Sequence, residues 1–212
     1  TIAGTPTVTG GVLRVASGGT LAVTGVNVGP NGAQLNVAGG LFSATGNVRV
    51  TPGSAAGVYI DSGTATFNTI DTTNTAGGVI RINGGTVTAN SINFPRSSDG
   101  TPNYTTGLVV TGGTTTVGTI GLGTNNSYGV MSVEGGALTA TGTVTLGNLG
   151  GNSNRGGAMR VLGGTFTSTD AVNGIVMSQR NNNTSIATFS GGVSTVEKVT
   201  MGFDANVLSG VA

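Results

Sequence analysis

The chain of 212 residues has no cysteine, histidine or tryptophan, and only 7% of its residues are charged. Without histidine it lacks the commonest general base and the commonest transition-metal ligand. Its net charge of +1 gives no electrostatic attraction to nucleic acid or to an anionic membrane surface. No apolar run is long enough for a transmembrane helix. The absence of cysteine fits a chain that crosses redox compartments. We therefore expect no cofactor, no metal, no nucleic-acid partner and no membrane insertion.

What the chain has in abundance is glycine, at 41 residues, together with threonine, valine, alanine and asparagine. Collagen is excluded because glycine does not recur at every third residue and there are only five prolines. The apolar fraction of 36% and the low net charge disfavour disorder. Valine, isoleucine and threonine favour strands, while glycine and asparagine favour tight turns, so the composition predicts an all-β fold.

A repeat runs through the whole sequence and is marked by a pair of glycines. The steps between the second residues of successive pairs are 21, 23, 22, 28, 23, 28 and 28, which suits one solenoid coil per repeat. Ser62-Gly63 takes the place of one pair, and the others are Gly18-Gly19, Gly39-Gly40, Gly84-Gly85, Gly112-Gly113, Gly135-Gly136, Gly163-Gly164 and Gly191-Gly192.

Apolar residues keep register with these glycines. They stand two and four positions before the first glycine, as Leu35 and Val37 do, and two and four positions after the second, as Phe42 and Ala44 do. In the first coil Leu13 and Val15 are one residue out of step. Each coil thus has two alternating strands around a glycine corner, and a third short strand follows in most coils.

This pattern predicts a single domain, residues 1–212, folded as a parallel β-helix of about eight coils with three sides and a right-handed winding. Inward columns of valine, isoleucine and leucine would fill a narrow core, and glycine would form the corners. The chief alternative is an antiparallel β-sandwich, whose strands have no need of one shared glycine phase.

Residues 136–147, Gly-Ala-Leu-Thr-Ala-Thr-Gly-Thr-Val-Thr-Leu-Gly, resemble the β-strand repeats of bacterial autotransporter passengers and related large surface proteins. The resemblance covers nearly the whole chain. It implies a secreted, surface-exposed β-helix on the outside of a bacterium, and it carries over no functional residues. The chain shows neither the membrane-barrel segment nor the sorting tail of such proteins, which leaves its anchoring open.

The acidic residues do not form an evident catalytic pair. Asp61 and Glu134 share one column before the glycine corner but stand three coils apart, roughly 14 Å at the ordinary strand spacing. A glycosidase pair needs about 5 to 9.5 Å. The glycine-rich segment at 147–151 lacks the lysine and helix of a phosphate loop, and the glycine pairs lack the aspartates of calcium-binding β-rolls. We therefore predict no catalytic, cofactor-binding or metal-binding residue.

Three long insertions are the candidate binding loops, because insertions in a repeat protein tend to emerge on one face. They span Pro95–Thr106, Asn148–Gly156 and Gln179–Thr184. Their arginine, tyrosine and asparagine side chains suit a glycan or a protein ligand, although loops also tolerate polar insertions at little cost. The candidate contact residues are Arg96, Asp99, Tyr104, Arg155, Arg180 and Asn182.

Two sets of outward-facing residues could also form binding surfaces. The mixed column at Asn36, Tyr59, Arg81, Val109, Ser132, Arg160 and Thr188 is interpreted as a solvated face. The abundant outward threonines would form flat, hydroxyl-lined strips of the kind that bind ice or crystalline polysaccharide. A strict Thr-x-Thr column on every coil is missing, which disfavours ice binding.

The ends of the chain suggest how the coils are used. Thr1 enters an already running pattern, and residues 208–212 resemble the start of a further coil. The chain is then either a segment of a longer solenoid or a unit that stacks end to end on copies of itself. We expect an extracellular structural protein, a fibre subunit or rigid stalk of a bacterial surface filament or adhesin. The alternatives are a glycan- or protein-binding adhesin module that uses the inserted loops and, less favoured, a carbohydrate-active enzyme.

Overall fold

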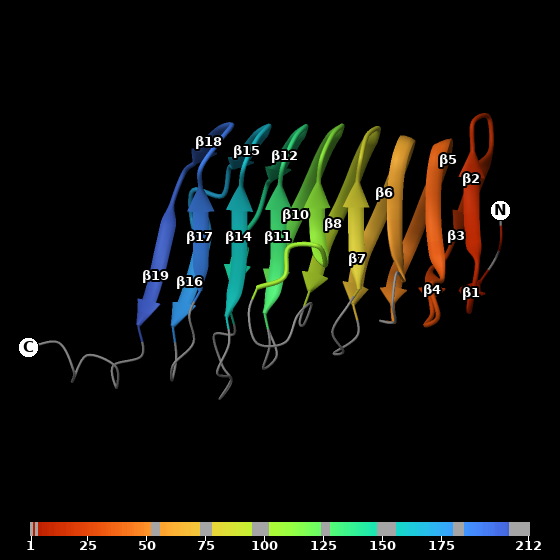
Figure 1. The fold of residues 1–212 in the computed structure, drawn as a ribbon, viewed down its shortest axis with the longest axis horizontal. Helices are drawn as coiled ribbons and strands as arrows, with labels where there is room; N and C mark the ends of the chain where they lie inside the picture. Colours follow the sequence, from red (N-terminus) through yellow and green to blue (C-terminus); the bar gives the residue numbers. More distant parts are fainter. Residues whose placement is uncertain are drawn as a thin grey trace, which may run out of the picture.

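A computed structural model describes residues 2, 4–51, 56–72, 78–94, 102–123, 128–147, 156–179 and 185–203. The described chain is all-β, and its 19 strands form one continuous wall in which every pairing is parallel. The chain climbs the near side of Figure 1, crosses to the far side and returns, while the coils advance from the N-terminus to the C-terminus. This is a right-handed parallel β-helix, as the glycine phase predicts.

The coil has three faces, and the first lies before the glycine corner. It contains β2 (Val12–Ala16), the first parts of β5 (Gln34–Val50) and β6 (Gly57–Thr72), and then β7 (Val79–Ile82), β9 (Gly107–Val110), β11 (Gly129–Val133), β14 (Gly157–Val161) and β17 (Ile186–Phe189).

The second face follows the corner. It contains β3 (Thr20–Val23), the middle parts of β5 and β6, the first parts of β8 (Thr86–Phe94) and β10 (Thr114–Leu122), and β12 (Ala137–Ala140), β15 (Thr165–Ser168) and β18 (Val193–Val196). The third face contains β1 (Thr7–Val8), β4 (Val26–Val28), the last parts of β5, β6, β8 and β10, and β13 (Val144–Leu146), β16 (Ile175–Gln179) and β19 (Val199–Phe203).

From residue 52 onward, each internal gap between the described ranges separates a third-face strand from the next first-face strand. The segments whose length varies between coils therefore leave and re-enter the solenoid at one corner, the phase that their spacing predicts.

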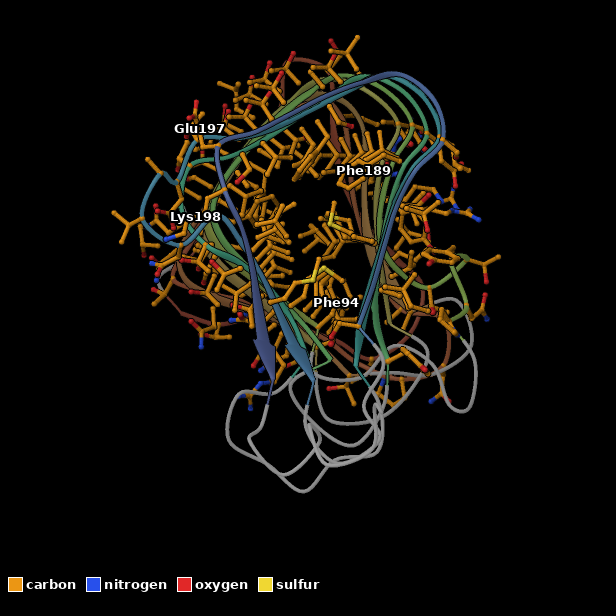
Figure 2. The ribbon with its side chains drawn as sticks, turned by 90° about the vertical axis from the view of Figure 1, so that its left-hand side faces the viewer. Phe94, Phe189, Glu197 and Lys198 are labelled. Carbon is orange, nitrogen blue, oxygen red and sulfur yellow. The ribbon has the colours of Figure 1, made fainter. Side chains whose placement is uncertain are left out.

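The inward columns form the core, which Figure 2 shows from the C-terminal end. Leu35, Val37 and their counterparts in the following coils are fully buried up to Val161. In the first coil, Leu13 pairs with Leu35 and Val15 with Val37, and the one-residue offset is absorbed by a register shift at Ala16. The core columns predicted from the sequence are thus confirmed, and the offset is a local bulge.

Large and small side chains alternate between the two inward columns of the second face. The second coil has Phe42 and Ala44, and the third has Ala65 and Phe67. Phe42 stacks on Ala65 and Ala44 on Phe67, so the two rings lie diagonally to each other with centroids 5.3 Å apart and tilted by 42°. This exchange fills the core without stacking two rings in one column.

Three buried hydroxyls, those of Thr72, Thr115 and Ser168, have no hydrogen-bond partner among the described residues. Thr115 is fully buried between Val87 and Leu138, and its Oγ1 has no hydrogen-bond partner among the described residues. Replacing Thr115 with valine, which has nearly the same shape, is expected to raise the free energy of unfolding by about 1–2 kcal/mol. Urea denaturation measures this, with the outward-facing Thr116→Val in the same strand expected within about 0.5 kcal/mol of wild type. An unchanged Thr115→Val midpoint would contradict the prediction.

Candidate functional site

Of the six predicted contact residues, Arg96, Asp99, Arg155, Arg180 and Asn182 lie outside the described residues. Tyr104 is described and is half-buried before β9. The guanidinium carbon of Arg160 lies 4.2 Å from the centre of its ring, a cation–π contact. Burial raises the pKa of the Tyr104 hydroxyl, and the charge of Arg160 opposes that rise. The structure therefore joins Tyr104 to a side chain of β14.

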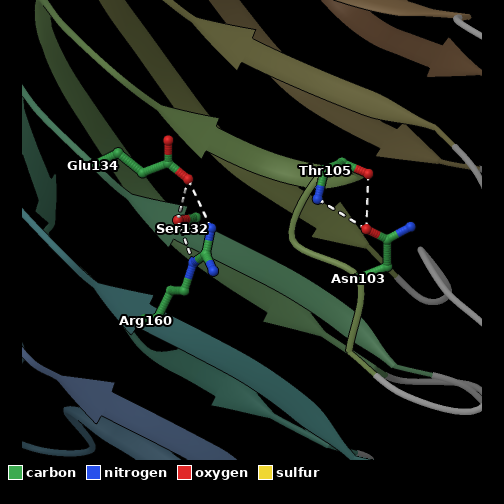
Figure 3. A network of polar contacts seen from close by, with 5 residues as sticks. All are labelled: Asn103, Thr105, Ser132, Glu134 and Arg160. Carbon is green, nitrogen blue, oxygen red and sulfur yellow. Dashed lines mark hydrogen bonds and ion pairs between the residues drawn. The ribbon is translucent and has the colours of Figure 1, made fainter.

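Tyr104 is positioned by a turn. The Asn103 side-chain oxygen accepts hydrogen bonds from the Thr105 backbone N–H at 3.1 Å and from the Thr105 hydroxyl at 2.7 Å. The Thr106 backbone N–H donates to the Asn103 carbonyl at 3.2 Å. An asparagine that bonds its own backbone two residues on is a common turn device. The turn holds the segment Pro102–Thr106 across the outer side of the first face (Figures 1 and 3).

Arg160 also closes a polar network with the neighbouring coil (Figure 3). Its Nε donates to the Ser132 hydroxyl at 2.9 Å, and its Nη2 lies 2.9 Å from Glu134 Oε1. The Ser132 hydroxyl donates to the same carboxylate oxygen at 2.9 Å. Burial acts to raise the pKa of Glu134, but the bonds from Ser132 and Arg160 outweigh it and the pKa is lowered. Glu134 is thus held ionised and engaged at neutral pH.

This arrangement corrects one prediction. The sequence predicts that the column containing Val109 and Ser132 is a solvated face, yet both residues are buried although they point outward. The segment Pro102–Thr106 and the side chain of Arg160 lie on the outer side of these positions. The strand period gives the direction of a side chain but does not reveal a loop that folds back over the strand.

A second polar ladder surrounds Asp61, whose carboxylate accepts a hydrogen bond at each oxygen. The Asn36 amide donates to Oδ2 at 2.7 Å, and the Asn83 amide of the next coil donates to Oδ1 at 2.8 Å. The Thr111 hydroxyl continues the ladder by donating to Asn83 at 3.0 Å. The bonds from Asn36 and then Asn83 hold the pKa of Asp61 below its usual value. Asn83 and Thr111 stand between Asp61 and Glu134, so the ladder joins neighbouring coils instead of pairing two acids.

The polar groups of the first face therefore bind mainly to one another. Among the described residues there is no group of three or more acidic, histidine or cysteine side chains that could hold a metal ion. What this face offers chemically is lateral cross-linking of adjacent coils.

The last described coil presents a different kind of surface. Its inward side chains Phe189, Val199 and Met201 are 45%, 48% and 63% exposed. The same columns are fully buried one coil earlier at Val161 and Ile175. In the described chain β17, β18 and β19 each pair on one side only, with β14, β15 and β16. Phe189 can be seen at this end in Figure 2. Within the described residues, this coil therefore has core positions and strand edges that no further coil covers.

Comparison with known proteins adds no family assignment. No protein-family model matches the chain, and no match was found among curated proteins or solved structures. The resemblance to autotransporter repeats stays a prediction. The described residues include no helix with the length and apolar character required to cross a membrane.

Proposed function

We propose that this chain is an extracellular structural protein, a fibre subunit or rigid stalk of a bacterial surface filament or adhesin, and that it extends by stacking of β-helix coils. The observation that carries the proposal is the last described coil, where Phe189, Val199 and Met201 continue the core columns and are exposed. A coil added above them would bury these side chains and pair the strand edges of β17 to β19.

The rest of the molecule suits a mechanical role. Eight coils at the usual strand spacing give a rod about 40 Å long. Its core is continuous from Val15 to Ile175, and the polar ladders around Asp61 and Glu134 tie neighbouring coils on the outside. With 7% charged residues and a net charge of +1, little electrostatic repulsion opposes the stacking of copies.

Electron microscopy of the isolated protein at several concentrations tests this proposal. We expect filaments or short stacks whose length grows with concentration, with an axial repeat close to the length of one rod. The variant Phe189→Glu should shift assembly to much higher concentration, because it places a charge in a core column at the joint. The control is Thr188→Glu. Thr188 is the neighbouring residue on the same strand and points outward, so this variant should assemble as wild type does.

Circular dichroism and limited proteolysis show whether Phe189→Glu keeps its fold. Dispersed single rods at every concentration would reject end-to-end assembly of this chain. So would a folded Phe189→Glu variant that assembles like wild type.

A further inference from the structure

The outer surface of the second face differs from the other two. The first face carries Arg14, Asp61 and Glu134, and the third carries Arg49 and Asp71. The outward positions of the described second face carry neither a charged nor an aromatic side chain. They are Thr20, Ala22, Leu41, Ser43, Thr64, Thr66, Thr86, Thr88, Thr114, Thr116, Ala137, Thr139, Thr165, Thr167, Val193 and Thr195.

Strand register turns these threonines into a two-dimensional array. One column is unbroken over six coils and contains Thr66, Thr88, Thr116, Thr139, Thr167 and Thr195, each paired with the next. The neighbouring column contains Thr64, Thr86, Thr114 and Thr165 and is interrupted at Ala137. Hydroxyls therefore repeat at about 4.8 Å along the axis and about 6.7 Å along each strand.

The array is open to solvent and regular. Its threonines are exposed or half-exposed, and none of their hydroxyls bonds to another described residue. A β-branched side chain has few rotamers, so the methyl and hydroxyl of each threonine have only a few alternative positions before anything binds. Figure 2, viewed from the C-terminal end, shows the coils stacked one behind another. The in-register pairing carries the same two rows of outward side chains from coil to coil.

We propose that the threonine array of the second face is an adsorption surface for ice. Isolated hydroxyls and methyls bind weakly, and their contributions add only against a partner that repeats with the same two periods. Ice presents a rigid, uncharged lattice of water oxygens with repeats of this size, and it can both donate and accept hydrogen bonds at each threonine hydroxyl. An extended crystal surface such as ice can be bound by a face that has no deep pocket.

Crystalline polysaccharide fits the face less well. Proteins generally bind sugar rings by stacking them on an aromatic side chain and by hydrogen bonds from planar side-chain groups to two sugar hydroxyls at once. None of the outward positions of the second face supplies either. The interruption at Ala137 leaves a methyl in place of a hydroxyl, a change that an array of many weak contacts tolerates. The inference does not depend on coil stacking and holds for a single rod.

Slow freezing of a dilute solution of the whole chain, followed by assay of the ice and the liquid, tests the proposal. We expect the wild type to be enriched in ice and to halt the growth of ice crystals held just below freezing. Thr116→Tyr, at the centre of the array, should lose most of both effects because the ring stands above the lattice plane. Thr119→Tyr is the matched control, since Thr119 is exposed in the same strand but on the third face, and it should behave as wild type.

Thermal unfolding of both variants shows whether each keeps its fold, which is expected because strand positions tolerate tyrosine. Exclusion of the wild type from ice, to the degree of an unrelated protein, would overturn the proposal. Equal loss in both variants, or none in Thr116→Tyr, would also overturn it. Retention on crystalline cellulose or chitin without enrichment in ice would replace ice with a polysaccharide as the partner.

Discussion

Replacing Gly136 with alanine is expected to lower the free energy of unfolding by about 3 kcal/mol or more. Gly136 has φ +67° at the corner between β11 and β12, a conformation that costs an L-residue about 1–2 kcal/mol. An added Cβ would also lie 2.5 Å from the Gly112 carbonyl carbon and 2.7 Å from the Gly113 oxygen in the coil beneath. The corner cannot move away freely, because the Thr165 N–H donates to the Gly136 carbonyl at 2.8 Å from the coil above.

Gly18→Ala separates these two effects. Gly18 has nearly the same conformation, φ +77°, but a Cβ there would meet nothing within 4 Å. We therefore expect Gly18→Ala to lose only about 1–2 kcal/mol, the cost of the backbone conformation alone. Urea denaturation followed by circular dichroism compares the two. Equal losses would mean that close stacking of the corners contributes nothing and that conformation alone explains the glycine.

Truncation of Phe67 to alanine is expected to destabilise the protein by about 3–5 kcal/mol, the usual range for a buried phenylalanine. Phe67 is 2% exposed, and its neighbours in the column, Ala44 and Ala89, are both small. The three stacked positions would then all be alanine. The strands around the resulting cavity are held by hydrogen bonds to the coils on both sides, so they cannot close on it. Phe42 would also lose its ring partner.

The control for this prediction is Phe67→Leu, which keeps most of the volume and should cost less than about 1.5 kcal/mol. Thermal or urea unfolding measures both variants, and far-ultraviolet circular dichroism checks that the strands persist. A loss below about 1 kcal/mol for Phe67→Ala would show that the core collapses around the gap, contrary to the rigid-wall argument.

Most of the fold could be predicted because the same sequence pattern recurs in every coil of a solenoid. Leu35 and Val37 take their meaning from the same positions in later coils, and the alternation around the glycine pair identifies strands, corner and core together. One detail escaped this logic. In the later coils the second glycine of each pair takes positive φ, as Gly136 does, whereas in the first two coils it is the first, Gly18 and Gly39. A register shift of one residue changes which glycine of the pair must adopt positive φ, while the Gly-Gly motif itself stays the same.

The surfaces were less predictable, since they depend on contacts between residues distant in sequence. The sequence predicts Tyr104 as a contact residue, but its partner Arg160 lies 56 residues later, and periodicity does not show that the loop with Tyr104 reaches Arg160. The sequence also shows the outward threonines, without a strict Thr-x-Thr motif on every coil. The observed pairing shows that the gaps fall at Ala137 and near the ends, so one column is continuous between Thr66 and Thr195. The glycine phase already aligns this column in the sequence, but it does not show whether a loop covers the column, and in the structure its threonines are exposed or half-exposed.

The exchange of ring and methyl between Phe42–Ala44 and Ala65–Phe67 bears on how such a chain can evolve. Genes built of near-identical repeats readily gain or lose whole units by misaligned recombination. The backbone ladder accepts such an event, because every coil offers the same hydrogen bonds. The side chains do not, since a tandem copy of the second coil would set one phenylalanine directly upon another and leave two alanines facing beside them. Neighbouring coils are thus matched in side-chain volume, and a new coil is expected to persist where it does not place one ring directly on another.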